Sequence, residues 1–268
     1  NWNAAITTLI KPLVYATDSL PAVMLISLLY GFFWFFGIHG ASIVGSIARP
    51  LWLTLLEANT TAVAAGVAGT QLPSISAEPF YQSFIFIGGA GTTIGLAILL
   101  VTVCKSKYAK DLGRIAFFPA LFNINEPIIF GAPIVLNVTL AIPFVLTPVV
   151  CGVISWFATV LGLVNRVSVN APWTLPGPIG AYLATGGDFR AIILSIVLIL
   201  VSILEKVYKL FGIEKEPPLT KYTLYLMRYS QTLNIDKAKK ELGYYPQISV
   251  LEGVKKYVKH IRENDRKS

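Results

Sequence analysis

A carboxylate and two carboxamides stand in the middle of an otherwise apolar stretch. Asn123, Asn125 and Glu126 occur within Ile115–Leu136, where Glu126 is the only charged residue. An ionisable side chain in such a stretch is costly unless it faces a partner or a water-filled cavity. The spacing therefore predicts a polar pocket around these three side chains. The alternative is a soluble core element with an exposed Asn-Glu-Pro turn.

The backbone of this stretch is expected to be interrupted. Pro119, Pro127 and Pro133 prevent one regular helix, and Gly131 weakens it further. Broken backbone at membrane depth is tolerated only where protein buries it or where it lines a cavity. We therefore expect a re-entrant or interrupted segment that carries the three polar side chains.

A histidine follows the first long apolar run. Leu20–Ile38 is uncharged and, at about 19 residues, long enough to span a bilayer. His39 comes directly after it, and a histidine at a membrane edge is in general more often structural than ligand-binding. Imidazole can nevertheless donate to and accept from hydroxyl groups, and the nearby Gly37 and Gly40 allow a ligand to approach the backbone closely.

Two further stretches contain residues for which a function can be considered. Residues 87–95 read I-G-G-A-G-T-T-I-G, but no lysine follows, unlike in a phosphate-binding P-loop, so close packing of helices is the better interpretation. Trp173 lies in the polar, Pro/Gly-rich segment 165–187. Its ring can stack on a pyranose or anchor the chain at a membrane interface.

The composition places most of the chain in a membrane. Of 268 residues, 54% are hydrophobic and 13% are charged, with a mean hydropathy of +0.65, which is too apolar for an ordinary soluble domain. Residues 1–204 contain 14 charged residues, whereas the much shorter remainder contains 22. This predicts an all-α polytopic membrane protein with transmembrane helices and re-entrant hairpins over residues 1–203. A small helical soluble tail is expected over residues 204–268.

The expected membrane segments follow from the apolar runs. Besides the first run, two segments are expected to span: Pro79–Cys104, broken by the glycine-rich residues 87–95, and Asn137–Val164. Phe189–Ile203 is apolar but short. The basic segment 104–114 is expected to be a cytoplasmic loop, because positive charge beside a span favours that side.

Residues 41–78 are expected to form a hairpin and its tip. Arg49-Pro50 interrupts Ala41–Leu56, which we interpret as one limb of a hairpin. Glu57–Glu78 is then expected to be a loop. Its polar residues Asn59, Gln71 and Glu78 are more readily explained by solvation than by contact with a ligand.

Four of these stretches resemble one known family. F-N-I-N-E-P-I-I-F-G-A-P-I-V-L-N (residues 122–137) resembles the signature of the lactose/cellobiose-type (chitobiose) membrane component, enzyme IIC, of the bacterial sugar phosphotransferase system. W-F-F-G-I-H-G, the glycine-rich segment, and P-W-T-x-P followed by T-G-G-D match the same family in the same order. The resemblance covers about residues 1–203, which correspond to the C-terminal half of a family member.

The resemblance implies a function and site residues. It implies a permease component that binds and translocates a β-linked disaccharide, which phosphorylated enzyme IIB, a separate subunit that carries the phosphoryl group on a cysteine, then phosphorylates. Glu126 and His39 are the implied catalytic residues, with Glu126 orienting the hydroxyl or acting as a general base. The implied substrate-binding residues are His39, Gly40, Gly89, Thr92, Asn123, Asn125, Glu126 and Trp173.

The expected partners are the disaccharide, phosphorylated enzyme IIB and the lipid bilayer, with homodimers in intact relatives. We expect the bacterial plasma membrane as the location, with the tail in the cytoplasm. No nucleic acid is expected, because acidic residues interleave the tail's basic ones. No cofactor or metal is expected, and Cys104 and Cys151 lack metal-ligand spacing.

The tail resembles a different group. Asp236 and Ser249 are expected to cap two helices, and T-L-N-I-D-K-A-K-K-E-L-G-Y-Y-P-Q-I-S-V-L-E-G resembles the C-terminal end of extended short-chain dehydrogenases/reductases. The cofactor fingerprint and the catalytic Tyr-x-x-x-Lys pair of that group are not evident, so no dehydrogenase activity is expected. The alternatives are a secondary transporter or channel, a membrane-anchored reductase or epimerase relative, and a truncated, non-functional fusion fragment.

Overall fold

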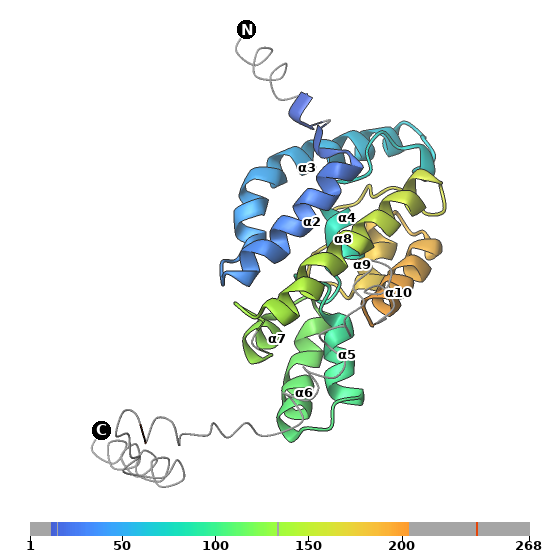
Figure 1. Ribbon diagram of the computed structural model, residues 1–268. Coiled ribbons are helices and arrows are strands. Elements are labelled where there is room, and N and C mark those ends of the chain that lie inside the picture. The colour runs from blue at the N-terminus through green and yellow to red at the C-terminus, as the bar shows by residue number, and fades with distance from the viewer. Residues whose placement is uncertain (1–11, 15, 133, 204–239, 241–268) are drawn as a thin grey trace, which may run out of the picture. The chain divides into compact units, whose positions relative to one another are not determined.

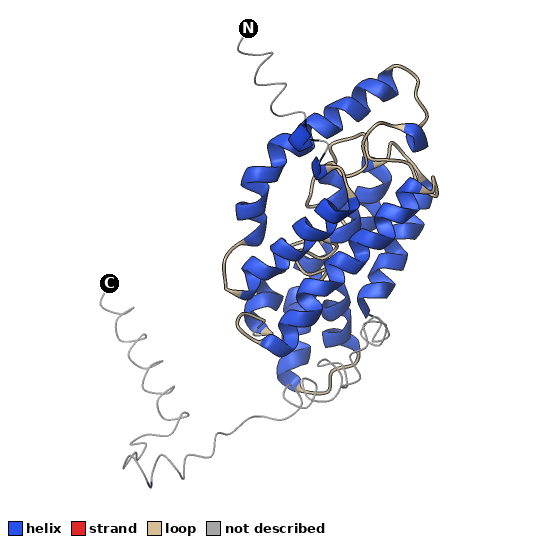
Figure 2. Cartoon of the chain, turned by 45° about the horizontal axis from the view of Figure 1, so that its top comes forward, coloured by secondary structure: helices blue, strands red, loops and turns tan. Residues whose placement is uncertain are grey.

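The computed structural model describes residues 12–14, 16–132, 134–203 and 240 of the chain. Throughout this part, the regular structure consists of helices joined by loops (Figures 1 and 2). The expected all-helical class is thus confirmed for the described residues. The capped helices expected in the tail lie outside them.

The longest apolar helix packs against the first apolar run. Helix α8 spans Val138–Val160, and within it Leu140–Val160 is long and apolar enough to cross a membrane, the one such helix within the described ranges. Helix α2 spans Leu20–Phe35 and lies beside α8 (Figure 1). A Cβ on Gly31 would lie 2.9 Å from the Cα of Val145, so glycine permits this close approach. A helix of spanning length thus lies within the expected span Asn137–Val164, whereas α2 ends after 16 residues.

The expected break at Arg49-Pro50 and the expected start of a loop at Glu57 are wrong, because helix α3 occupies both positions. It runs without a break from Gly40 to Ala64, through Pro50. Proline removes one helical hydrogen bond, but Trp52 and Leu55 are almost completely buried just beyond it, and their burial favours continuation. Asn59 is also buried, where its carboxamide bonds Ser74 and the carbonyl of Val167.

The glycine-rich segment forms a loop between two helical pieces. The short helix α4 (Glu78–Phe80) continues into the π-helix η2 (Tyr81–Ile85), and α5 (Ile94–Thr102) follows a loop. In that loop Gly88, Gly89, Gly91 and Thr92 all have positive φ. Consecutive left-handed residues cannot continue a helix, so Pro79–Cys104 is broken at the glycine-rich segment, as expected, and its crossing of a membrane stays a prediction. Helix η2 itself is buried and packs against α8 and α9 (Gly177–Ala184).

The stretch with the central polar residues is interrupted as expected. Helix α6 spans Lys107–Leu121, and the short helix α7 spans Glu126–Gly131. The break between them carries Asn123 in the left-handed region, with φ 62°. Helix α6 begins within the basic segment, since Ser106 caps it by accepting from the Ala109 amide at 3.0 Å. The expected basic loop is therefore largely helical.

The remaining helices complete the bundle. Helix α10 (Phe189–Ile203) packs against α9 and α5, and α5 packs against α6. A short 3-10 helix, η1, spans Gly69–Gln71. Large apolar side chains on several helices remain exposed, including Ile47 at 73% and Phe118 at 67%. So much exposed apolar surface is typical of a chain that contacts lipid.

Candidate functional site

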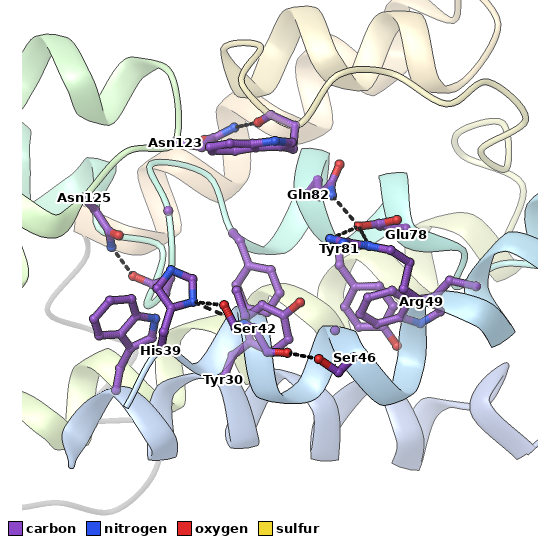
Figure 3. Close-up of a pocket in the computed structure, with 18 of the residues that line it drawn as sticks. Tyr30, His39, Ser42, Ser46, Arg49, Glu78, Tyr81, Gln82, Asn123 and Asn125 are labelled. Carbon is purple, nitrogen blue, oxygen red and sulfur yellow. Dashed lines mark hydrogen bonds and ion pairs between the residues drawn. The ribbon is translucent and has the colours of Figure 1, made fainter. Parts of the chain in front are cut away.

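A cavity of about 770 Å³ lies where α2, α3, η2, the glycine-rich loop and the α6–α7 break meet (Figure 3). Its volume falls within the usual range for small-molecule sites, about 300–1,000 Å³. Six of the eight predicted site residues line it: His39, Gly89, Asn123, Asn125, Glu126 and Trp173. The other two, Gly40 and Thr92, are not part of the cavity wall.

His39 is held in one orientation at the start of α3. Its Nδ1 accepts from the backbone amide of Ser42 at 3.2 Å, and the Ser42 hydroxyl lies 2.9 Å away. The ring also packs against Trp34, with 4.7 Å between ring centroids. Because Nδ1 accepts the amide proton, the proton of a neutral ring resides on Nε2. Nε2 is the atom that faces Glu126.

Glu126 faces His39 across a gap. It is the first residue of α7, and its Oε1 lies 3.9 Å from Nε2 of His39. Its other oxygen, Oε2, is buried and has no hydrogen-bond partner among the described residues. A distance of 3.9 Å is too long for a hydrogen bond, but one hydroxyl oxygen can lie about 2.8 Å from both atoms. Such a hydroxyl would accept from His39 and donate to Glu126.

The two asparagines fasten the α6–α7 break to its surroundings. Asn123 accepts the Gly88 amide at 2.8 Å and donates to the carbonyls of Trp173 and Leu175 at 2.6 and 3.0 Å. Asn125 donates to the carbonyl of Ala90 at 2.6 Å and to the hydroxyl of Thr93 at 2.9 Å. These bonds position Glu126, and the predicted direct contacts of the two asparagines with sugar stay predictions.

Of the remaining predicted residues, Gly89, Gly40 and Thr92 have packing roles, whereas Trp173 is exposed at the cavity wall. Gly89 has φ 93°, and a Cβ there would lie 2.5 Å from Cγ of Asn125, so only glycine lets the loop approach the break. Gly40 packs against the Tyr30 carbonyl at the start of α3. Thr92 is buried and donates to the carbonyl of Ile85 at 2.7 Å. Trp173 is 52% exposed, so its ring is available at the cavity wall.

Sequence reasoning missed the far end of the cavity. Arg49 and Glu78 form an ion pair there, with 3.0 Å between Nη2 and Oε1, and Gln82 donates to the same oxygen at 3.0 Å. Ser42 and Ser46 also line the cavity. His39, Ser42, Ser46 and Arg49 recur with the spacing of one helix face. That signal was present in the sequence, but the Arg49-Pro50 pair pointed to a broken helix.

An all-helical fold with exposed apolar surface, interrupted helices and a polar internal cavity is the architecture of a membrane transporter. The comparisons with known proteins identify the family. Residues 2–148 match the family described as "Phosphotransferase system, EIIC". This match covers more than half of the chain, which therefore belongs to the EIIC family, whose members are integral membrane proteins.

Curated relatives and a solved structure agree with this family. The chain is 41% identical to the cellobiose-specific EIIC component of Geobacillus stearothermophilus, over 70% of the chain and 42% of that protein. It is 38% identical to a lactose-specific EIICB component of Streptococcus mutans, over 74% of the chain and 34% of that protein. The chain thus spans well under half the length of these relatives.

The fold is similar to the crystal structure of ChbC, the IIC component of an N,N'-diacetylchitobiose-specific phosphotransferase system. The TM-score is 0.74 at 32% identity, covering 90% of this chain and 51% of that one. The family expected from the sequence motifs is therefore confirmed. The resemblance of the tail to short-chain dehydrogenases/reductases is not supported by the comparisons.

Proposed function

We propose that this chain forms the sugar-binding part of a permease that holds a β-linked disaccharide for phosphorylation by enzyme IIB. The observation that carries the proposal is the 3.9 Å gap between His39 Nε2 and Glu126 Oε1 on the wall of the cavity. The names of the relatives support the substrate class, because cellobiose, lactose and N,N'-diacetylchitobiose are all β-linked disaccharides. The EIICB relative supports enzyme IIB as the partner.

The gap suits the chemistry of phosphoryl transfer to a hydroxyl. The sugar hydroxyl between the two side chains donates its proton to Glu126 while its oxygen attacks phosphorus. A P–O bond forms, the P–S bond to the phosphocysteine of enzyme IIB breaks, and the thiolate leaves. His39 Nε2–H donates to the hydroxyl oxygen and fixes its direction. General-base assistance of this kind contributes about 10²–10⁴-fold to a rate.

The test is Glu126→Gln in the purified chain, reconstituted in lipid nanodiscs. We expect calorimetry to show binding of cellobiose to the wild type, and the variant to lose at least 100-fold in the rate of sugar phosphorylation by phosphorylated enzyme IIB. Asp111→Asn is the matched control, since Asp111 pairs with Arg114 on the exposed part of α6, outside the cavity wall.

Two results would overturn the proposal. Wild-type rates in the glutamine variant would remove Glu126 from the reaction. Uptake of unmodified sugar, independent of phosphoenolpyruvate and enzyme IIB, would instead make the protein a secondary transporter.

A further inference from the structure

The cavity has a second polar end that the phosphorylation chemistry does not use. Figure 3 shows His39 and Asn125 on one side of the cavity and Arg49, Glu78 and Gln82 on the other. Helix α3 connects the two ends. From His39 to Arg49 it rises by about 15 Å, at 1.5 Å per residue. That length is more than one sugar ring needs, so a ligand seated at Glu126 reaches the far end only through a second ring.

At the far end, all the donors contact the same oxygen of the Glu78 carboxylate. Arg49 Nε and Nη2 and Gln82 Nε2 all point to one oxygen of Glu78, Oε1, each at 3.0 Å. Among the described residues nothing donates to Oε2 of Glu78, and Arg49 Nη1 donates to no acceptor. The Glu78 side chain is 13% exposed and lines the cavity. A carboxylate has room for about four donors, so Oε2 is an acceptor still available to a ligand.

The pair is also electrically neutral as a unit. A hydroxyl is both a donor and an acceptor, so it can donate to Glu78 Oε2 while accepting from Arg49 Nη1. An anionic group would meet the Glu78 charge, and a cationic group would meet the Arg49 charge. A charged ligand group would be repelled by one residue of the pair and attracted by the other. The repulsion costs more than the attraction contributes, so the site rejects charged ligands.

We infer that the Arg49–Glu78 pair is a specificity site for the ring that does not react, and that it selects a second ring bearing uncharged hydroxyl groups. The inference rests on the function proposed above and adds the far ring to it. Arg49 and Glu78 would then make the protein bind uncharged disaccharides more tightly than one-ring glucosides or charged disaccharides. The competing explanation is that the pair only ties α3 to α4, in which case all ligands should be affected alike.

The test compares ligands that differ only at the far ring. Binding is measured by calorimetry on the full chain in nanodiscs, with cellobiose as the two-ring probe and methyl β-D-glucopyranoside as the one-ring probe. We expect Glu78→Gln to weaken cellobiose binding at least tenfold and methyl glucoside binding less than twofold. Arg114→Gln, which changes an exposed arginine outside the cavity wall, should leave both affinities unchanged.

Substitutions that remove one charge of the Arg49–Glu78 pair test whether the pair selects uncharged ligands. Glu78→Gln leaves the Arg49 charge uncompensated, so β-D-glucopyranosyl-(1→4)-D-glucuronic acid, with its carboxylate on the far, reducing ring, should gain at least tenfold relative to cellobiose. Arg49→Gln leaves Glu78 uncompensated and should favour β-D-glucopyranosyl-(1→4)-D-glucosamine, whose single amine lies on the far, reducing ring. The double variant Arg49→Gln/Glu78→Gln restores neutrality and should lose both gains.

The outcomes separate the two proposals. Equal weakening of one-ring and two-ring ligands by Glu78→Gln, or no change in charge preference, would overturn the inference alone. Absence of any disaccharide binding by the wild type would overturn the proposed function and the inference with it. Glu126→Gln should impair phosphorylation while leaving the charge preference of the far end as in the wild type.

Discussion

Two carboxylates, Asp188 and Glu126, show how differently one chemical group is used in this protein. Asp188 precedes α10, and its Oδ1 accepts from the amide and Nε of Arg190, each at 2.9 Å. Its Oδ2 accepts from the Asn165 amide at 2.8 Å and from Arg190 Nη2 at 3.0 Å. Glu126 has a buried Oε2 without a partner in the described structure and an Oε1 held 3.9 Å from His39.

The contrast separates structural carboxylates from available ones. Buried polar groups in folded proteins are nearly always hydrogen-bonded, so an exception asks for an explanation. Asp18 belongs with Asp188, since its Oδ1 lies 2.8–3.0 Å from the amides of Ile75 and Ser76 and from the Ser76 hydroxyl. Glu126 is the exception: its Oε2 has no partner in the described structure, and its Oε1 is open to a substrate hydroxyl placed between it and His39.

The largest expected effect on stability comes from Asp18. Asp18→Ala should lower the free energy of unfolding by about 2–4 kcal/mol, because three donors on Ile75 and Ser76 lose their acceptor. Asp18→Asn, which keeps an acceptor oxygen, should lose clearly less. Thermal unfolding in detergent measures both, and an alanine variant as stable as the wild type would contradict the structural role.

Gly89 should matter for binding through the Asn-Glu segment. Gly89→Ala places a Cβ 2.5 Å from Cγ of Asn125, which displaces the segment that positions Glu126, so cellobiose affinity should fall by about tenfold, or about 1.4 kcal/mol. Gly66→Ala is the matched control, because Gly66 has φ +84° but nothing within 4 Å of the added Cβ. Equal loss of affinity in both variants would show that backbone strain alone is responsible.

Asp188 should contribute a smaller, pH-dependent stabilisation. Burial alone would raise the pKa of Asp188, but the Arg190 guanidinium and the amides of Asn165 and Arg190 hold that pKa below its ordinary value. A carboxyl group whose pKa is lowered by folding stabilises the fold at pH values above its unfolded-state pKa of about 3.9. The stabilisation is lost as the pH falls through the folded-state pKa.

Asp188→Asn should therefore reduce stability by about 1 kcal/mol at pH 7. The difference from the wild type should shrink as the pH falls below about 4. Unfolding temperatures of both proteins between pH 7 and pH 3 test this. A difference that stays constant over that range would rule out the charged form of Asp188 as its cause.

The smallest expected effect on stability belongs to the residue most important for the proposed reaction. Glu126→Gln should change the free energy of unfolding by no more than about 0.5 kcal/mol, because Oε2 makes no hydrogen bond that the variant would lose. The same unfolding assay measures it. A loss as large as that of Asp18→Ala would place Glu126 among the structural carboxylates.

The sequence predicted the near end of the cavity because its signals are local. Glu126 inside an apolar stretch beside Pro127 indicates both a break and a polar cavity within a few residues. His39 was added by the family motif. The break, and the presence of these side chains on one cavity wall, agree with the structure.

The ion pair at the far end could not be predicted because it joins residues 29 positions apart. Arg49 meets Glu78 only if α3 continues through Pro50 and the chain returns beside it. Whether a proline ends a helix depends on the burial of Trp52 and Leu55 beyond it, which is a tertiary property. The turn at Gly88 likewise depends on a bond from its amide to Asn123.

The bonds of Asn123 have a kinetic consequence. Its carboxamide joins the amide of Gly88 to the carbonyls of Trp173 and Leu175 before any ligand is present. Three walls of the cavity, distant in sequence, are thereby ordered during folding. Little loop entropy is left to be lost when a ligand enters. Ligand binding to this part of the cavity should therefore show one exponential phase, whose observed rate constant rises linearly with ligand concentration. No slow phase from rearrangement of these loops is expected.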